Sequence, residues 1–181
     1  MPDTYQGSEL WNFSLVDPDN RQPVNFASRH AMLRALSSPH LPELIERWPD
    51  GRIKLFTLSR ALRFRRDHAE LFLHGDYEGL TMDADQPYLV AFSRRHHGDE
   101  VIVLVPRFQA TLFHGHPQGP FGAERWRTVS IRLPRRLAGA TLVNVFTQEV
   151  VDPAVLHDVP WLPAASAFQS WPVAMLQAKR G

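Results

Sequence analysis

The sequence contains no cysteine, and this absence excludes several kinds of site at once. Without a thiol the chain can form no disulfide, no zinc–thiolate centre and no cysteine nucleophile. A chain that uses no disulfides also suits a reducing compartment.

Net charge is almost absent as well. The chain has 20 Lys and Arg against 19 Asp and Glu, which leaves a net charge of +1 with His neutral. Such a balance gives no strong overall field that would attract a polyanion or an acidic bilayer. We therefore expect neither nucleic acid nor a membrane among the partners of this protein.

Long hydrophobic runs are also missing. The longest is VIVLV at 101–105, far short of the roughly 20 apolar residues that a membrane-spanning helix needs. The first residues lack the basic, apolar and small-residue pattern of a signal peptide. These features predict a soluble protein of the cytoplasm.

The common cofactor and nucleophile motifs are absent too. The sequence has no G-x-S-x-G, no P-loop and no G-x-G-x-x-G, so we expect no cofactor. The histidine pairs His96–His97 and His114–His116 have no third ligand spaced nearby. Adjacent residues of a strand point to opposite faces, which makes the first pair a poor chelate. We expect surface loops there and no metal.

A calcium loop is a weak interpretation of Asp17 and Asp19. An EF-hand requires oxygen ligands at alternate positions and then a glycine. Here Arg21 occupies the third alternate position and no glycine follows. Asp-Pro and Asp-Asn are also frequent turn formers, so a simple turn is the competing interpretation.

What the sequence does contain is an ordinary globular mixture, with 181 residues of which 44% are hydrophobic. Helical patterns come first, at 26–36, 41–48 and 52–69. Asn25 is a candidate N-cap for the first of them. The last has apolar residues on two sides, which is typical of a helix packed between two bodies.

Strand patterns follow after Tyr77. Apolar or alternating runs occur at 88–93, 101–108, 127–134, 141–147 and 171–176. The first two flank RRHHGDE and predict a hairpin with that polar loop between them. Short strands joined by Gly and Pro turns predict an antiparallel β-sandwich of about 100 residues. The expected fold class is α+β, with a boundary near 75–80.

The stretch PDTYQGSELW at 2–11, followed by SLVDPDNRQPVNF at 14–26, resembles a region of the maltooligosyl trehalose synthase family. That family belongs to the α-amylase superfamily of glycoside hydrolases. The resemblance continues in the same order along most of the chain, through 50–66, 70–80, 143–147 and 171–176.

The resemblance implies the C-terminal part of such an enzyme. Residues 1–75 would be the end of a catalytic (β/α)₈ barrel, its last βα loop and closing helices, and residues 76–181 a C-terminal β-sandwich domain. The family converts the reducing-end α-1,4 linkage of maltooligosaccharides into an α,α-1,1 linkage by retaining intramolecular glucosyl transfer. Its catalytic carboxylates lie on earlier barrel strands, so we expect no catalytic residue here and no activity from this chain alone.

Substrate contacts are expected in the first stretch. In the full enzyme Tyr5, Gln6 and Trp11 would line the sugar site by stacking and hydrogen bonding. Without the resemblance, burial in a core is the ordinary expectation for such aromatic residues. Asp19 and Arg21 would either bind sugar hydroxyls or hold neighbouring loops through a charge-assisted pair.

The resemblance also implies partners. These are a maltooligosaccharide, bound through the full-length enzyme, and the missing catalytic barrel, supplied in cis or in trans. A homo-oligomer through the N-terminal part is a further possibility. Two other interpretations stay open: a non-catalytic β-sandwich module that binds glucan or acts as a scaffold, and one chain of a split enzyme.

Overall fold

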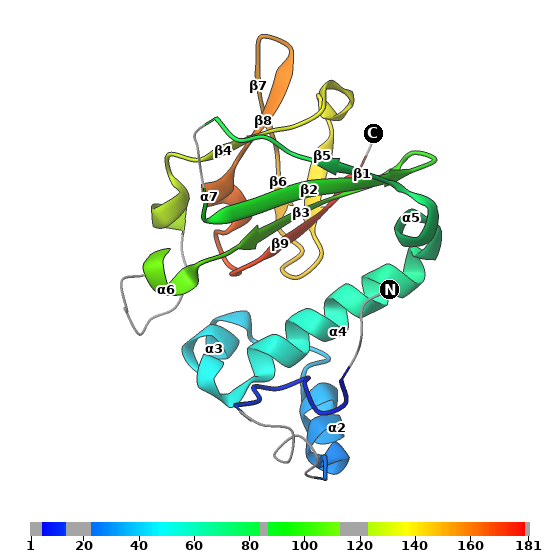
Figure 1. Cartoon of the computed structure of the whole chain (residues 1–181), viewed down its shortest axis with the longest axis vertical. Coiled ribbons are helices and arrows are strands. Elements are labelled where there is room, and N and C mark those ends of the chain that lie inside the picture. The colour runs from blue at the N-terminus through cyan, green and yellow to red at the C-terminus, as the bar shows by residue number, and fades with distance from the viewer. Residues whose placement is uncertain (1–4, 14–22, 84–86, 113–122, 180–181) are drawn as a thin grey trace. The chain divides into compact units, whose positions relative to one another are not determined.

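The computed structural model describes residues 5–13, 23–83, 87–112 and 123–179. Within these ranges the chain is α+β, as predicted, and every strand pairing is antiparallel. The chain divides into two compact units, Met1–Arg60 and Ala61–Gly181. The division falls inside helix α4, Arg52–Asp67 (Figure 1).

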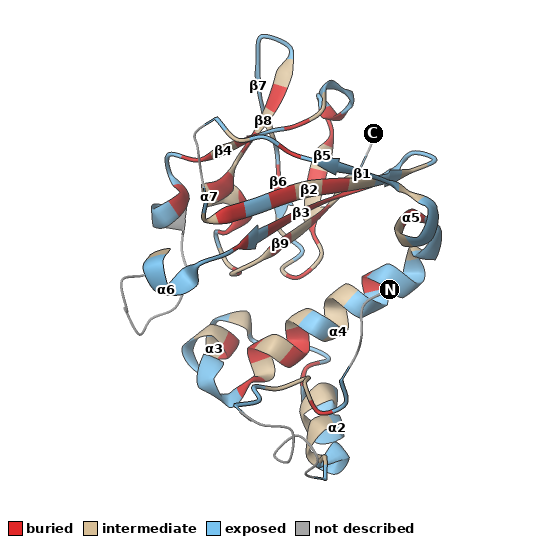
Figure 2. Ribbon diagram, in the orientation of Figure 1, coloured by how far each residue is buried: buried red, intermediate tan, exposed pale blue. Residues whose placement is uncertain are grey.

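The first unit is helical. It contains α2 (Phe26–Ala35), α3 (Leu41–Glu46), the 3₁₀ helix η1 (Trp48–Asp50) and the first half of α4. The predicted N-cap is confirmed, because Asn25 Oδ1 accepts a hydrogen bond from the Ser28 backbone N at 2.9 Å. Among the described residues of this unit the buried apolar ones are few (Figure 2): Leu36, Leu44, Ile53, Leu55 and Phe56.

The second unit is built on two sheets. In the described residues, a six-stranded sheet has the order β1-β2-β3-β9-β5-β6 and a three-stranded sheet the order β4-β8-β7. The strands of the large sheet, in that order, are Asp76–Gly79, Leu89–His96, Asp99–Pro106, Ala174–Lys179, Thr141–Asn144 and Val150–Val151. Those of the small sheet are Ser130–Arg132, Val159–Pro163 and Ala154–Leu156. Short helices join them: α5 (Ala69–His74), α6 (Gln109–Leu112), η2 (Ala123–Trp126), η3 (Arg135–Leu137) and α7 (Ala164–Ala167).

The predicted hairpin is confirmed, but its loop is much shorter than expected. Strands β2 and β3 pair as far as His96 and Asp99, so most of RRHHGDE belongs to the strands. His97 and Gly98 close the turn with φ values of 44° and 105°. A two-residue turn with positive φ matches the twist of the strands, which lets pairing continue to the end.

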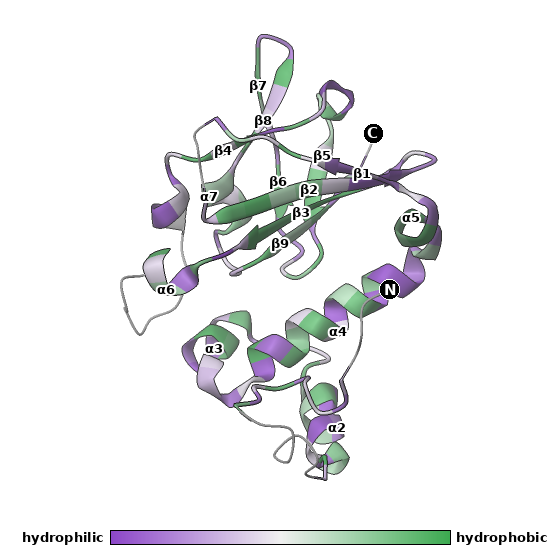
Figure 3. Cartoon of the chain, in the orientation of Figure 1, coloured by the Kyte–Doolittle hydropathy of each residue, from purple (hydrophilic) through white to green (hydrophobic). Residues whose placement is uncertain are grey.

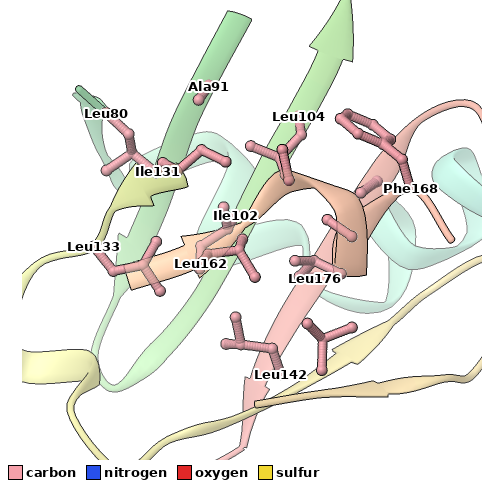
Figure 4. Close-up of a cluster of buried hydrophobic side chains, with 14 of the residues drawn as sticks. Leu80, Ala91, Ile102, Leu104, Ile131, Leu133, Leu142, Leu162, Phe168 and Leu176 are labelled. Carbon is pink, nitrogen blue, oxygen red and sulfur yellow. The ribbon is translucent and has the colours of Figure 1, made fainter. Parts of the chain in front are cut away.

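The two sheets share one hydrophobic core. Leu104, Leu142 and Leu176 come from the large sheet, whereas Ile131 and Leu162 come from the small one (Figure 4). Along β2 the burial alternates, with Leu89, Ala91 and Ser93 buried between more exposed residues. The alternation follows from the two-residue period of a strand, which sends successive side chains to opposite faces.

A buried carboxylate is neutralised at the edge of this unit. Glu100 on β3 is fully buried, and Arg136 of η3 binds it through Nε at 3.1 Å and Nη2 at 2.8 Å. The same Nη2 reaches Glu78 Oε2 at 2.6 Å. The hydrogen bond to Glu100, above all, raises the pKa of Arg136 above its usual value. A buried charge is tolerated only when it is paired in this way.

Part of the outer face of the large sheet is covered within the same unit. Phe64, Leu71 and Val101 form a second buried cluster. Arg94 Nη2 donates to the Phe72 carbonyl oxygen at 3.0 Å, which ties α5 to β2. No helix in the described part of the chain is long and apolar enough to cross a membrane.

Candidate functional site

The predicted sugar-binding residues Tyr5, Gln6 and Trp11 lie on one described segment, residues 5–13, in the first unit. Tyr5 is 63% exposed and Trp11 38% exposed, and Gln6 is exposed too. Burial in a core, the competing expectation for the two aromatic residues, therefore does not apply to this structure. Asp19 and Arg21 lie outside the residues that the structure describes.

The segment makes a tight turn at Gly7. Its φ of +85° is a backbone conformation that residues with a side chain rarely adopt. A Cβ placed on Gly7 would also lie only 2.8 Å from Val24 Cγ2. Both observations require glycine here, and the turn places Tyr5 and Gln6 just ahead of the anchored residues that follow.

Arg29 of α2 anchors the turn. Its Nη2 donates to the Gly7 carbonyl oxygen at 2.9 Å, and its Nε donates to Glu9 Oε2 at 3.0 Å. The ion pair is mostly shielded from solvent, with side-chain exposures of 19% for Arg29 and 31% for Glu9. A charge-assisted contact of this kind is stronger than a neutral hydrogen bond, so the path of the segment is held by a helix 20 residues away in sequence.

A second anchor lies at Leu10 and Trp11. Lys54 Nζ of α4 donates to the Leu10 carbonyl oxygen at 3.0 Å and lies 5.5 Å from the centre of the Trp11 ring. Trp11 Nε1 donates to the Trp48 carbonyl oxygen at 2.8 Å. The two indoles meet edge to face, with ring centres 6.1 Å apart, a favoured aromatic geometry.

Arg29, Trp48 and Lys54 were not predicted as site residues. Each contacts the segment from 20 to 44 positions away in sequence. A lone Arg, Trp or Lys on a helix carries no local sign of such a partner. Only the folded chain shows these contacts.

An ion-pair network fixes the 3₁₀ helix that bears Trp48. Arg52 donates through Nε to Asp50 Oδ2 at 2.7 Å and through Nη2 to Glu43 Oε1 at 3.0 Å. The hydrogen bond from Arg52 lowers the pKa of Glu43, and the hydrogen bond to Asp50 raises that of Arg52. Because α3, η1 and α4 each supply one member, the network holds the three elements together.

Metal ligation finds no support in the described ranges, where no group of three or more His, Cys, Asp or Glu is arranged to hold an ion. His96 and His97 lie at the β2–β3 turn with ring centres 4.1 Å apart. They line a cavity of about 330 Å³ together with His74, Asp76 and Arg95. His114, His116 and Asp17 lie outside the described residues.

Comparison with known proteins identifies a counterpart. No family model matches the chain. Two curated proteins of Mycobacterium tuberculosis, from strains CDC 1551 and H37Rv, are each named "Putative maltooligosyl trehalose synthase". Each is 42% identical over 113 residues, which are 62% of this chain and 12% of the relative.

A solved structure agrees with this match. The crystal structure of a maltooligosyl trehalose synthase is similar to 99% of this chain, with a TM-score of 0.63 and 26% sequence identity. The resemblance seen in the sequence is therefore confirmed. This chain spans only 20% of that structure and about an eighth of the curated relatives, so it corresponds to one part of them.

Proposed function

We propose that this chain forms one portion of a trehalose-forming isomerase, in which it supplies a wall of the sugar site and a supporting β domain. The observation that carries the proposal is the structural match over 99% of the chain to a maltooligosyl trehalose synthase. The 42% identity to the two curated relatives supports it independently.

The chemistry requires more than this chain supplies. A retaining transfer uses one carboxylate to form a glycosyl-enzyme and a second to protonate the leaving sugar. The leaving glucose must then stay bound, turn and attack through its anomeric hydroxyl, while water is kept out to prevent hydrolysis. We place both carboxylates in the remaining four-fifths of the enzyme, and we expect no turnover from this chain alone.

The two parts of the chain take different roles in this proposal. Residues 1–75 are the last βα loop and closing helices of a (β/α)₈ barrel, and residues 76–181 are the C-terminal β-sandwich. The helical first unit and the core shared by two antiparallel sheets support a helical part followed by a β part, although the two compact units divide at Arg60 and Ala61, before the proposed boundary. Because barrel active sites lie on βα loops at the C-terminal ends of the strands, the first segment would face the sugar.

The anchored segment fits that role. Tyr5 and Trp11 offer exposed rings for stacking, and Gln6 offers both a donor and an acceptor to sugar hydroxyls. A binding wall is effective only when its geometry exists before the ligand arrives. The contacts made by Arg29 and Lys54 provide that rigidity. Asp19 and Arg21 would extend the same wall, either by binding hydroxyls or by holding a neighbouring loop.

A partner is needed to cover apolar surface on the second unit. The end of α4 and α5 form an open hollow of about 280 Å³ lined by Leu62, Arg65, Arg66, Ala69, Phe72 and Leu73. Leu62 and Leu73 are both exposed. We propose that the catalytic barrel, supplied in cis or in trans, covers this surface. A second copy of the chain is the alternative occupant. The absence of cysteine supports a cytoplasmic location for the enzyme.

The test is a chimera in which this chain replaces the matching part of an M. tuberculosis relative. With maltohexaose as substrate, the chimera should consume reducing ends without releasing glucose, whereas the isolated chain should consume none. Tyr5→Ala should lower the rate about tenfold, the ratio that about 1.4 kcal/mol of lost contact produces, and Tyr5→Phe should lower it less. A correctly folded but inactive chimera would contradict the proposal.

The competing function is a non-catalytic module that binds glucan or acts as a scaffold. The exposed rings of Tyr5 and Trp11 favour it as well, because they could hold a sugar in the absence of the barrel. Saturable binding of maltohexaose to the isolated chain, combined with an inactive chimera, would support the module. Turnover by the chimera would support the isomerase.

A further inference from the structure

Two tryptophans of the first unit are partly exposed. Trp11 is 38% exposed and Trp48 37% exposed, whereas Trp126 and Trp171 in the second unit are each 1% exposed. Tryptophan buries more apolar area than any other residue when it is enclosed, so leaving two indoles open forgoes stability. Both indoles are therefore accessible in this chain.

The open indoles are also held in place. Trp11 is fixed by its hydrogen bond to the Trp48 carbonyl oxygen, by the edge-to-face contact and by Lys54 near its ring. Trp48 lies on η1 beside Asp50, which Arg52 ties to Glu43. Contacts within the protein therefore hold the pair in place.

The surrounding polar groups match a ligand that has both apolar faces and hydroxyls. Lys54 Nζ has three N–H donors and uses one of them in its hydrogen bond to the Leu10 carbonyl oxygen. The side chain of Arg47, next to Trp48, is 67% exposed, and that of Asp50 is 36% exposed. Donors and acceptors around an exposed aromatic surface suit a pyranose ring, whose C–H face packs on the indole while its hydroxyls reach outward.

We infer that Trp11 and Trp48 form an indole platform that binds a glucose unit of an α-glucan, with Trp48 as a binding residue of its own. The inference rests on the proposed function for its ligand class and extends it to a residue outside the 5–13 segment. Lys54 is a positioning residue for the platform, because it acts through Leu10 and Trp11.

The test is a titration of the isotopically labelled chain with maltohexaose, observed through its five indole N–H signals in nitrogen–proton correlation spectra. Substituting Trp11 and Trp48 in turn by Phe assigns their signals. Both signals should shift saturably, with a midpoint of about 1 mM or below. The signals of Trp126 and Trp171 should stay in place and report that the second unit is folded.

Variants make the test decisive. Trp48→Ala should weaken binding about tenfold, the loss expected for one aromatic contact, whereas Trp48→Phe should keep most of it. Tyr77→Ala is the matched control, because Tyr77 is an exposed aromatic of the second unit. Equal affinity of Trp48→Ala and the parent chain, or an unmoved Trp48 signal, would overturn the inference. Equal shifts with sorbitol, which has hydroxyls but no ring, would overturn it too.

The failure of this inference can be told from the failure of the proposed function. If the chimera forms trehalose ends while Trp48→Ala leaves its KM unchanged and the Trp48 signal does not move, the platform is wrong and the function stands. If maltohexaose shifts both signals but the folded chimera is inactive, the platform stands and the isomerase is wrong.

Discussion

The two units of this protein are stabilised in different ways. The second unit encloses a continuous apolar core between two sheets, to which both contribute side chains. The first unit buries few apolar residues, and its first segment is held by polar side chains that bind backbone carbonyl oxygens. The contrast indicates that the second unit supplies stability, while the first presents exposed side chains in a fixed geometry.

The largest effect should come from the shared core. Ile102→Ala removes a fully buried side chain of β3 and should cost about 2–5 kcal/mol of unfolding free energy, measured by urea titration. Val90→Ala is the matched control, because Val90 is a partly exposed residue of the neighbouring strand. Similar losses from both substitutions would mean that the core is not what stabilises this unit.

A smaller and local effect should follow from Arg29→Met. This change leaves the Gly7 carbonyl oxygen and Glu9 without their donor. Hydrogen bonds to charged groups contribute about 1.5–3 kcal/mol, and partial exposure reduces that figure. Backbone amides of residues 5–13 should exchange faster, while those of the second unit should keep their protection.

Arg34→Met is the control for the loss of a positive charge from α2. It should leave the exchange of the 5–13 segment unchanged. If Arg34→Met and Arg29→Met accelerate exchange equally, general charge rather than the anchor holds the segment, and the contrast between the two units loses its basis.

The smallest effect on stability should appear at low pH. Because Arg52 lowers the folded-state pKa of Glu43 below its usual 4.5, Glu43 contributes stability above pH 4.5 that is lost as the pH falls through the lower folded pKa. Glu43→Gln should therefore flatten the acid limb of unfolding in the first unit below pH 4.5. Trp48 fluorescence, in a variant whose other tryptophans are replaced by Phe, would follow it. If Glu43→Gln leaves the acid limb unchanged, the ion pair between Glu43 and Arg52 does not help to hold η1.

Local signals predicted much of the fold. Asn25 marks the start of α2 through a hydrogen bond within the first turn, which is a property of adjacent residues. The apolar run at 101–105 became β3, and its pairing with β2 follows from the turn at His97 and Gly98. Strand β1 was missed because its sequence, DYEG, is hydrophilic and exposed (Figure 3).

Three more strands were missed for other reasons, and one of them, β8 with the sequence VPWLP, contains two prolines, which argue against a strand. Strands β6 and β7 have two and three residues, too few to show a period, and β7 is exposed throughout. Pairing with the adjacent strand, β5 for β6 and β8 for β7, rather than a periodic pattern makes them strands.

The candidate site likewise has features that local sequence predicts and others that only the fold shows. The sequence by itself determined the helix start at Asn25, the hairpin and the likeness of its first residues to a sugar-converting enzyme, because each depends on neighbouring residues. Only the tertiary structure decided that Arg29 and Lys54 hold the segment and that Trp48 joins Trp11. These contacts join positions up to 44 residues apart, and the distance between two such side chains is a property of the fold rather than of sequence spacing.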